Sequence, residues 1–350
     1  MSTHPRSQIY YWKCDRLAAF HGTDERRRDE AAITGPLMEA LRSTFPGVTI
    51  TMRPAPSQGN HLTFVATMDA KDRFVRVEDG PEGDDYMAVE SRVMTAVREL
   101  GVPTPVIYAV DASRKSVPFA WQVMDQVPFP DLNKHHQAGT LDLPAIAEAA
   151  GAAVARWQAL SVTGFGPFDP QCTSNLKGFH SSYADYFHQH LERHLHFLVN
   201  EKFLPRDVAE EIRRAIERHH TLLALDQGCL VHKDLALWNI LGSETTIAAF
   251  IDFDDAIAGD PMDDLSLLAC FHDSPTIERA LEGYASVRPL PEHHERRLAL
   301  HLLRNMIVKA VIRVGAGYFD RKEGFFLNGN GKDLRTLTHE KLNTAIGALQ

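Results

Sequence analysis

The sequence predicts an α+β protein of two lobes, a small β-rich lobe followed by a larger, mainly helical one. Its 350 residues exceed the length at which one hydrophobic core usually stops growing, so two units are the better expectation. Several short runs between residues 48 and 127 alternate apolar with polar side chains, as half-buried strands do. Beyond residue 142, apolar side chains recur every three or four positions, which is typical of amphipathic helices.

The small lobe is expected over residues 37–126. A helix is predicted at 35–45, and the runs VTITMRP, HLTFVATM and DRFVRVED, separated by proline, glycine and aspartate, are typical of short strands. A second helix is predicted at 84–100, and two more strands at 101–111 and 118–127. Strands and helices in this order can form one sheet-based unit.

The larger lobe is expected over residues 127–350. One β-like island, 229–254, interrupts its helices, with NIL and TIAAFID as the two strands of a hairpin. The predicted helices are 143–160, 183–199, 206–225 and 292–314. A mainly helical lobe does not need a lone hairpin for packing, so the island is the first place to look for chemistry. Residues 1–36 are an N-terminal extension, and the sequence leaves open whether they form a cap or a dimer contact.

Composition excludes several classes of protein. No apolar run approaches the roughly 20 residues of a membrane helix, and the first residues lack the features of a secretory signal, so a cytoplasmic protein is expected. The four cysteines show no CxxC spacing, which argues against a disulfide framework or a thiolate zinc site. A formal charge of -9 disfavours binding to nucleic acid and is compatible with a cationic small molecule.

Six aspartates fall between positions 252 and 264, and carboxylates at this density repel one another unless a cation or hydrogen bonds offset them. In the predicted hairpin, Asn239 and Asp252 lie almost opposite each other. Their oxygen atoms are hard ligands that suit Mg²⁺. Asp234 precedes the hairpin and is placed to accept a proton from a hydroxyl. Three later aspartates, in GDPMDDLSLLA, fit the first turn of a helix.

These segments resemble the aminoglycoside phosphotransferase family, whose relatives include choline kinases and protein kinases. HKDLALWN and IDFDDAIAGDPMDDL are similar to its HxDxxxxN catalytic loop and its D…GDP…DL segment. RFVRVEDG, VESRVMTAVRELGVPTPVIYAVD and AWQVMDQV resemble its phosphate-binding strand, the following helix and strand, and the nucleotide hinge. TGFGPFDPQ resembles a segment of hygromycin phosphotransferases. The resemblance covers about residues 37–270 and implies a two-lobed protein-kinase-like fold.

The resemblance also implies roles for individual residues. Asp234 would be the catalytic base that orients the acceptor hydroxyl, and Asn239 and Asp252 would hold the Mg²⁺ ions that bridge the nucleotide phosphates. Arg76 would contact the α and β phosphates and pair with Glu90. An arginine suits this position because its planar fork holds phosphate with two hydrogen bonds.

The nucleotide-binding residues are expected in two places. Gly59 and Asn60, in SQGNHLTF, lie where the family has its phosphate-covering loop. In the hinge, the backbone carbonyl of Asp125 and the N–H of Val127 would contact adenine, and Met124 would line the pocket. The nucleotide is expected to be ATP, with GTP as the alternative.

Two groups of polar residues stay open. His232 is expected to brace the catalytic loop by hydrogen bonding, whereas Lys233 would either contact the transferring phosphate or face solvent. In the histidine cluster at 188–196, His190 and His194 are four residues apart and suggest a zinc pair, but no HExxH and no third ligand accompany them. Alternatively, these histidines line an acceptor pocket or flank an amphipathic helix.

The predicted function is that of an ATP-dependent kinase that transfers the γ-phosphoryl group to a hydroxyl of an aminoglycoside, a sugar or an amino alcohol. One alternative is a metabolic sugar or amino-sugar kinase unrelated to antibiotic resistance. Another is a non-catalytic kinase-fold binding protein, although the intact base and metal ligands argue against it. A glycoside hydrolase would leave Asn239 and Arg76 unexplained, and no GxxxxGK[ST] is present. The oligomeric state is left open.

Overall fold

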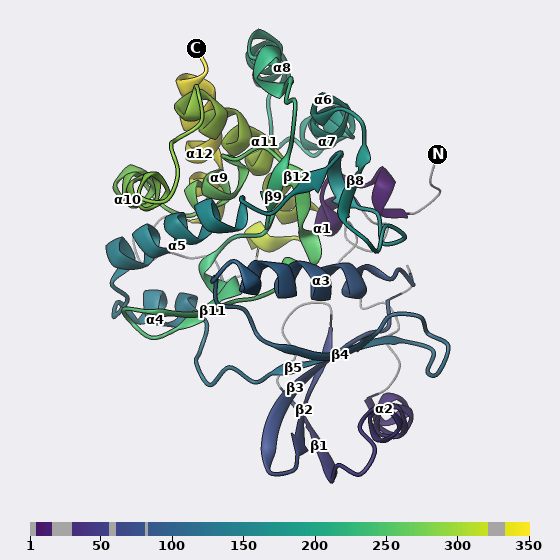
Figure 1. Ribbon diagram of the computed structural model, residues 1–350. Helices are drawn as coiled ribbons and strands as arrows, with labels where there is room; N and C mark the ends of the chain where they lie inside the picture. Colours follow the sequence, from purple (N-terminus) through teal and green to yellow (C-terminus); the bar gives the residue numbers. More distant parts are fainter. Residues whose placement is uncertain (1–4, 16–29, 56–60, 81–82, 321–332) are drawn as a thin grey trace.

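A computed structural model describes residues 5–15, 30–55, 61–80, 83–320 and 333–350 of the protein. A β-rich lobe lies at the bottom of Figure 1 and a larger helical lobe at the top, with one long helix between them. This arrangement confirms the predicted α+β fold of two lobes. None of the described helices is long and apolar enough to cross a membrane.

The small lobe is an antiparallel sheet with spatial order β1-β2-β3-β5-β4. Its elements are α2 (Glu30–Thr44), β1 (Ile50–Pro54), β2 (Leu62–Met68), β3 (Lys71–Glu78), α3 (Tyr86–Glu99), β4 (Ile107–Asp111) and β5 (Ala120–Asp125). All five predicted strands and both helices are present. The first helix begins at Glu30, ahead of the predicted start at residue 35, because Ile33 continues the apolar side formed by Leu37 and Leu41 and is itself fully buried.

Helix α3 joins the two lobes. It lies between the sheet of the small lobe and the helices of the larger one (Figure 1). Its apolar side, with Val89, Val93 and Val97, is buried in the same core as the interior of the larger lobe. The small lobe therefore packs on the larger lobe through this helix, which contacts the turn Phe253–Asp255 that follows the hairpin.

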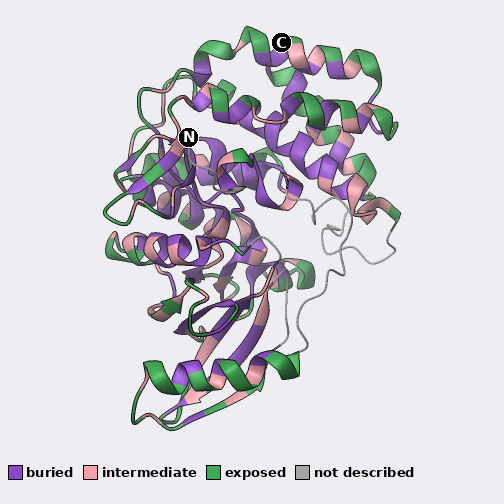
Figure 2. Ribbon diagram, turned by 90° about the vertical axis from the view of Figure 1, so that its right-hand side faces the viewer, coloured by how far each residue is buried: buried purple, intermediate pink, exposed green. Residues whose placement is uncertain are grey.

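The larger lobe is built around α11 (His294–Gly315), most of whose residues are buried. Figure 2 shows that buried residues gather in the interior and exposed ones on the outer sides of the helices. Its helices are α4 (Leu132–Ala138), α5 (Leu143–Trp157), α6 (Tyr183–His188), α7 (Leu191–Asn200), α8 (Arg206–Arg218), α9 (Asp263–Ala269), α10 (Ser274–Ala285), α11 (His294–Gly315) and α12 (Leu334–Ala348). The predicted hairpin is present as β10 (Ile240–Gly242) and β11 (Ile247–Phe250).

The expectation of a single β-like island was incomplete. A second sheet, of order β6-β8-β7-β12-β9, contains β6 (Val162–Thr163), β7 (Phe165–Phe168), β8 (Leu176–His180), β9 (Cys229–Val231) and β12 (Ile257–Gly259). β6 has only two residues, and β7 and β8 are short and each contain a glycine, so these strands show little alternation of apolar and polar residues. Gly178 is required here because a Cβ at this position would lie 2.3 Å from the carbonyl oxygen of Phe165.

The predicted helix at 183–199 is broken into α6 and α7. His190, at the break, adopts a left-handed conformation with a φ of 57°. Its Nε2 contacts the carbonyl oxygen of Gln8 at 2.7 Å, and Gln189 donates a hydrogen bond to the carbonyl of Ser7. The break therefore lies where the N-terminal segment packs, and these distant contacts are invisible in the local helical pattern.

Candidate active site

The predicted catalytic loop is positioned by buried carboxylates at the start of α9. Asp264, fully buried, accepts hydrogen bonds from the backbone N–H groups of His232 and Lys233 at 3.0 and 3.1 Å. It also accepts one from the indole of Trp157. Burial raises the pKa of Asp264 to about 6, against the effect of these partners. Asp263 and Asp264 are thus in the first turn of α9, as predicted, whereas Asp260 precedes the helix and pairs with Arg297 and His301.

Lys233 neither faces solvent nor extends toward the neighbouring Asp234. Only 1% of the residue is exposed, and its ammonium donates to Asp263 at 2.7 Å, to the amide oxygen of Asn305 at 3.1 Å and to the hydroxyl of Tyr10 at 3.2 Å. Its φ of 69° is unusual for a residue with a side chain. Because the backbone is held in this conformation, Lys233 is directed into the core while Asp234 points elsewhere.

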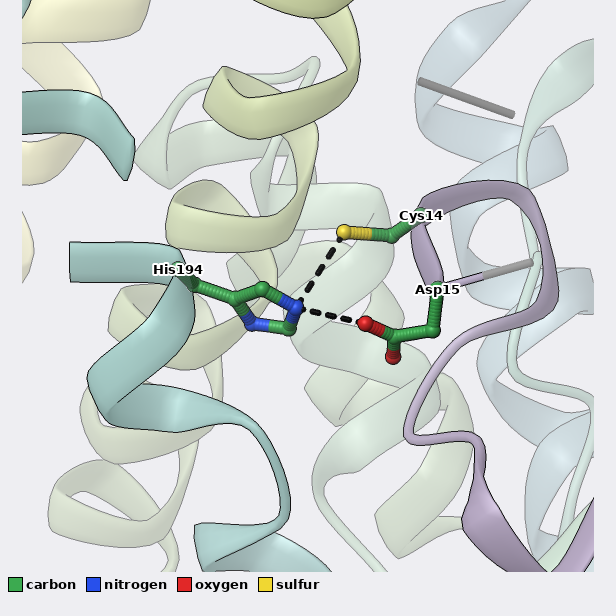
Figure 3. A group of neighbouring side chains, drawn as sticks. All are labelled: Cys14, Asp15 and His194. Atoms are coloured by element: carbon green, nitrogen blue, oxygen red, sulfur yellow. Dashed lines mark hydrogen bonds and ion pairs between the residues drawn. The ribbon is translucent and has the colours of Figure 1, made fainter. Parts of the chain in front are cut away.

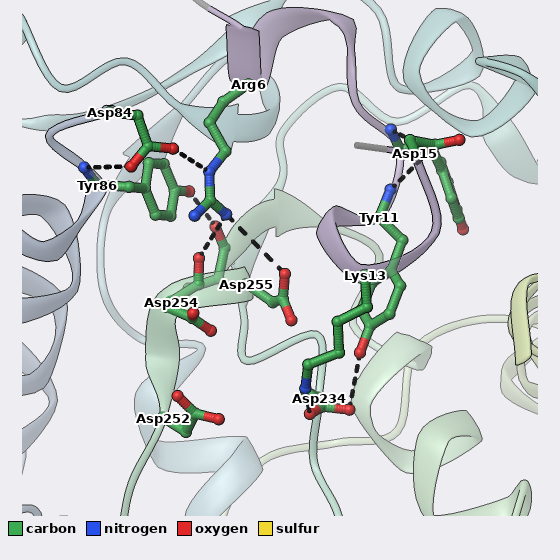
Figure 4. Close-up of polar contacts among 12 residues, drawn as sticks. Arg6, Tyr11, Lys13, Asp15, Asp84, Tyr86, Asp234, Asp252, Asp254 and Asp255 are labelled. Carbon is green, nitrogen blue, oxygen red and sulfur yellow. Dashed lines mark hydrogen bonds and ion pairs between the residues drawn. The ribbon is translucent and has the colours of Figure 1, made fainter. Parts of the chain in front are cut away.

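Asp234 receives hydrogen bonds on both carboxylate oxygens. Asn239 donates to Oδ2 at 3.1 Å and also to the backbone carbonyl of Asp234 at 2.8 Å. The hydroxyl of Tyr11 donates to Oδ1 at 2.9 Å, and the ammonium of Lys13 donates to Oδ2 at 2.6 Å (Figure 4). Burial alone would raise the pKa of Asp234, but the charges of Lys13 and Lys309 hold this pKa below its ordinary value.

His232 braces the loop, as expected. Its Nε2 contacts the carbonyl oxygen of Ile251 at 2.9 Å, and its Nδ1 accepts a hydrogen bond from the backbone N–H of Asp234 at 3.3 Å. These two contacts connect the loop to the strand that leads to Asp252. Trp238 adds an apolar anchor, since its ring packs edge-on against Phe271.

The hairpin brings Asn239 and Asp252 together at its open end, opposite the turn. The backbone N–H of Ile251 donates to the carbonyl of Asn239 at 3.0 Å, so Asp252 directly follows the residue opposite Asn239. Asp252 has a φ of 67°, and such strained backbone at a non-glycine residue is concentrated at functional sites. Its Oδ1 accepts a hydrogen bond from Arg76 at 3.1 Å.

The predicted contact between Arg76 and Glu90 is present, from the guanidinium to Oε2 of a carboxylate that is fully buried. Arg76 therefore connects α3 with Asp252 on the larger lobe. In the hinge, Met124 is buried, Val127 is half-buried, and the side chain of Asp125 accepts hydrogen bonds from Arg73, Tyr108 and the backbone of Val106. Gly59 and Asn60 lie outside the described residues.

Two further residues extend the predicted metal site. Ligand atoms of His61, Asp252 and Asp254 all lie within 4.8 Å of one another. The Nε2 of His61 is 3.6 Å from Oδ2 of Asp254. Burial opposes ionisation of Asp254, but the hydrogen bond and charge of His61 lower its pKa. The two carboxylate oxygens fit a hard divalent cation such as Mg²⁺, which takes oxygen ligands and keeps several waters.

Asp255 differs from its neighbours. It is 5% exposed, and burial together with the charge of Asp254 raises its pKa to about 8. Arg6 lies 4.0 Å from its Oδ1 and donates a hydrogen bond to the backbone carbonyl of Asp254 at 2.9 Å (Figure 4). Two neighbouring aspartates thus have pKa values shifted in opposite directions.

The sequence reasoning missed the N-terminal contributors Arg6, Tyr11 and Lys13. The clearest available signal was the aromatic run IYYWKC, which is unusually apolar for a solvated extension. In the structure, Tyr10, Tyr11 and Trp12 are each at most 5% exposed.

The histidine pair does not form the zinc site that its spacing suggests. His194 instead contacts Asp15 at 2.7 Å and Cys14 at 3.4 Å through Nε2 (Figure 3). Its Nδ1 is 3.1 Å from a guanidinium nitrogen of Arg304, which can only donate. The neutral ring therefore carries its proton on Nε2 and donates to Asp15. A guanidinium beside the ring disfavours a metal ion here, although the three ligand atoms lie within 4.8 Å of one another.

The known proteins that resemble this chain share the fold described above. The model of the phosphotransferase enzyme family matches residues 51–299. No curated protein matches the chain. Among solved structures, a thermostable mutant of aminoglycoside phosphotransferase APH(4)-Ia, in a ternary complex with AMP-PNP and hygromycin B, has a TM-score of 0.63 at 16% identity, covering 89% of this chain and 97% of that one.

Two other solved structures are similar. A putative fructosamine-3-kinase from Thermobifida fusca YX-ER1 has a TM-score of 0.61 at 18% identity and covers 89% of this chain and 97% of that one. The gentamicin complex of APH(2")-IIa has a TM-score of 0.54 at 15% identity, covering 93% and 96%. At these identities the likeness shows a shared fold, the two-lobed kinase-like fold expected from the motifs.

Proposed function

Because the chain belongs to the phosphotransferase enzyme family and is therefore a phosphotransferase that acts on small-molecule hydroxyls, we propose that it transfers the γ-phosphoryl group of ATP with Asp234 as the catalytic base. The observation that carries this proposal is the contact at Asp234. One carboxylate oxygen accepts a hydrogen bond from a hydroxyl, that of Tyr11, at 2.9 Å, while Asn239 holds the other oxygen at 3.1 Å. This oxygen thus accepts a hydrogen bond from a hydroxyl group, as general-base catalysis requires of it toward the acceptor.

The reaction proceeds as a direct transfer. The acceptor oxygen forms a bond to the γ-phosphorus, the bond from this phosphorus to the β,γ-bridging oxygen breaks, and the acceptor proton passes to Asp234. A carboxylate with a lowered pKa is ionised at neutral pH, so it is ready to accept a hydrogen bond. Its main contribution is orientation of the nucleophile rather than strong basicity.

Asn239 and Asp252 would hold Mg²⁺, with Asp254 and His61 adjacent to the same position. When bound, Mg²⁺ neutralises charge on the nucleotide phosphates. Arg76 would bind the α and β phosphates, and its contact with the buried Glu90 fixes its direction. The hinge at 124–127 would bind adenine, or guanine if GTP is the donor.

The acceptor is an aminoglycoside, a sugar or an amino alcohol. The similar solved structures include complexes with hygromycin B and gentamicin as well as a putative fructosamine kinase, so both antibiotic and sugar chemistry occur on this fold. A metabolic sugar or amino-sugar kinase is the second candidate, because fructosamine-3-kinases are also among the structural neighbours. The non-catalytic alternative is a protein of this fold that binds its ligand without phosphorylating it.

An ATP-consumption assay tests the proposal. The full chain is incubated with Mg²⁺-ATP and a panel of aminoglycosides, sugars, amino sugars and amino alcohols, and ADP release is measured. Asp234→Asn should lower acceptor-dependent turnover by at least about a hundredfold, with the affinity for Mg²⁺-ADP retained. Asp207→Asn, at the exposed start of α8, is the matched control. Near-normal turnover in Asp234→Asn would exclude its role as base, and acceptor-independent hydrolysis alone would favour the binding protein.

A further inference from the structure

The N-terminal segment 5–15 is part of the active site although it lies outside the residues that the family model matches, 51–299. It consists of a 3₁₀ turn, Pro5–Gln8, and the short helix α1, Trp12–Asp15. In Figure 1 this segment, coloured purple, lies against the larger lobe next to α3 and β8. It thereby reaches Asp234, more than two hundred residues further along the chain.

Extensive contacts fix the segment in place. The ring of Tyr10 stacks on that of Tyr186, with the centroids 4.8 Å apart, and the guanidinium carbon of Arg304 lies 3.6 Å from the centroid of the Tyr10 ring. The hydroxyl of Tyr186 donates to the backbone carbonyl of Tyr10 at 2.7 Å. At the end of the segment, Asp15 binds both Arg193 and the buried His194.

The beginning of the segment binds the other side of the active site. Arg6 is 4% exposed and donates to the carboxylate of Asp84, just before α3, at 2.8 Å. Its guanidinium also lies 4.0 Å from the ring centroid of Tyr86. Removing the segment would expose several buried aromatic side chains and break ion pairs at both ends. The segment is therefore a firmly packed part of the site rather than a loosely bound peptide.

Lys13 is the residue of this segment that could take part in the reaction. Its ammonium lies 2.6 Å from Oδ2 of Asp234, and 36% of its side chain is exposed, against 4% for Asp234. Lys233, the neighbouring residue in the chain, is buried and bound to Asp263. Lys309 on α11 also lowers the pKa of Asp234 but is only 9% exposed. The cation in direct contact with the catalytic carboxylate thus comes from the N-terminal segment, and it is accessible to a ligand.

Phosphoryl transfer at this site requires positive charge. The three equatorial oxygens of the transferring group carry negative charge in the transition state, and the surrounding carboxylates of Asp234, Asp252 and Asp254 would repel them. An ammonium held at Asp234 stands where the acceptor oxygen and the phosphorus approach each other. A fixed cation at the place where charge is transferred stabilises the transition state more than the ground state.

We propose that Lys13, carried into the active site by segment 5–15, is a catalytic residue whose ammonium binds the phosphoryl group during its transfer to the acceptor hydroxyl. This inference rests on the proposed function, because it takes Asp234 as the base beside which transfer occurs. Two other roles for the segment make opposite predictions. If it blocked the acceptor position, losing Lys13 would raise turnover, and if it were a substrate, Tyr11 would become phosphorylated.

The first experiment measures binding of a transition-state mimic, which needs no knowledge of the acceptor. Affinities of the full chain for Mg²⁺-ADP and for Mg²⁺-ADP with aluminium fluoride are compared in wild type, Lys13→Met, Lys13→Arg and the control Lys134→Met, whose side chain is 60% exposed on α4. Lys13→Met should weaken binding of the fluoride complex about a hundredfold and leave Mg²⁺-ADP binding unchanged. Lys13→Arg should recover part of the loss.

Equal affinities of wild type and Lys13→Met for the fluoride complex, at equal thermal stability, would overturn the inference. Failure of the wild-type chain to bind Mg²⁺-ADP would instead overturn the proposed function, and the inference with it. In the panel assay, Lys13→Met should lower kcat about a hundredfold with little change in the KM for ATP. An unchanged or raised kcat, or phosphate on Tyr11 found by mass spectrometry after incubation with Mg²⁺-ATP, would also refute the role of Lys13.

Discussion

His194 should make the stability of the protein depend on pH, and His194→Gln should remove that dependence. The ring is fully buried between Asp15 and Arg304. Burial lowers the pKa of His194 from 6.5 to about 4, and the charge of Arg304 adds to this, although the hydrogen bond with Asp15 opposes it. The unfolded chain therefore takes up a proton near pH 6.5, whereas the folded chain takes it up only near pH 4. Stability from this group is complete above pH 6.5 and is lost as the pH falls.

The expected size follows from that shift. A difference of one pKa unit corresponds to about 1.4 kcal/mol, so this group should cost the folded state about 2 kcal/mol at pH 5 and about 3 kcal/mol at pH 4. Glutamine is a suitable replacement, because its amide offers both a hydrogen-bond donor and an acceptor and does not titrate.

Urea unfolding of wild type, His194→Gln and the solvent-exposed control His293→Gln at pH 8 and pH 5 measures the effect. The difference in unfolding free energy between wild type and His194→Gln should move by about 2 kcal/mol in favour of the variant at pH 5. Other buried groups titrate in both proteins and cancel in this difference. If the difference were the same at both pH values, the reasoning about the neutral ring would be wrong.

Two further substitutions test how the site is supported. Lys233→Met should destabilise the protein by about 3–5 kcal/mol in urea unfolding, since Asp263 would lose its buried cation; a loss below about 1 kcal/mol would contradict the buried ion pair. Gly151→Ala should lower the melting temperature, because its Cβ would lie 1.8 Å from the carbonyl oxygen of Ala280 and would force α5 and α10 apart. Gly347→Ala, where a Cβ meets nothing within 4 Å, is the control, and equal melting temperatures for the two variants would refute the close helix contact.

The part of the site that could be predicted from sequence is the part made by local structure. Asp234, Asn239 and Asp252 lie on one loop and hairpin, so their spacing alone indicated that they meet. Arg76 and Glu90 lie on a strand and the next helix, and the family resemblance was enough to pair them.

The rest could not be predicted because it depends on contacts between distant residues. Nothing in the local pattern indicates that Lys13 meets Asp234 or that Lys233 turns into the core toward Asp263. The same applies to the break at His190, where a continuous apolar stripe predicted one helix. Contacts with distant residues determine the backbone conformation there, and the spacing of apolar residues carries no information about such contacts.

The position of segment 5–15 has a practical consequence for producing the protein. A fragment cut to the limits of the family model, 51–299, would lack Lys13 and its supporting helix α1. Its inactivity in an assay would say nothing about the enzyme. Arg6, next to the first described residue, binds Asp84 just before α3, whereas the C-terminal end of α12 lies at the outer end of the larger lobe (Figure 1). Screening for the acceptor is therefore best begun with the whole chain, tagged at its C-terminal end.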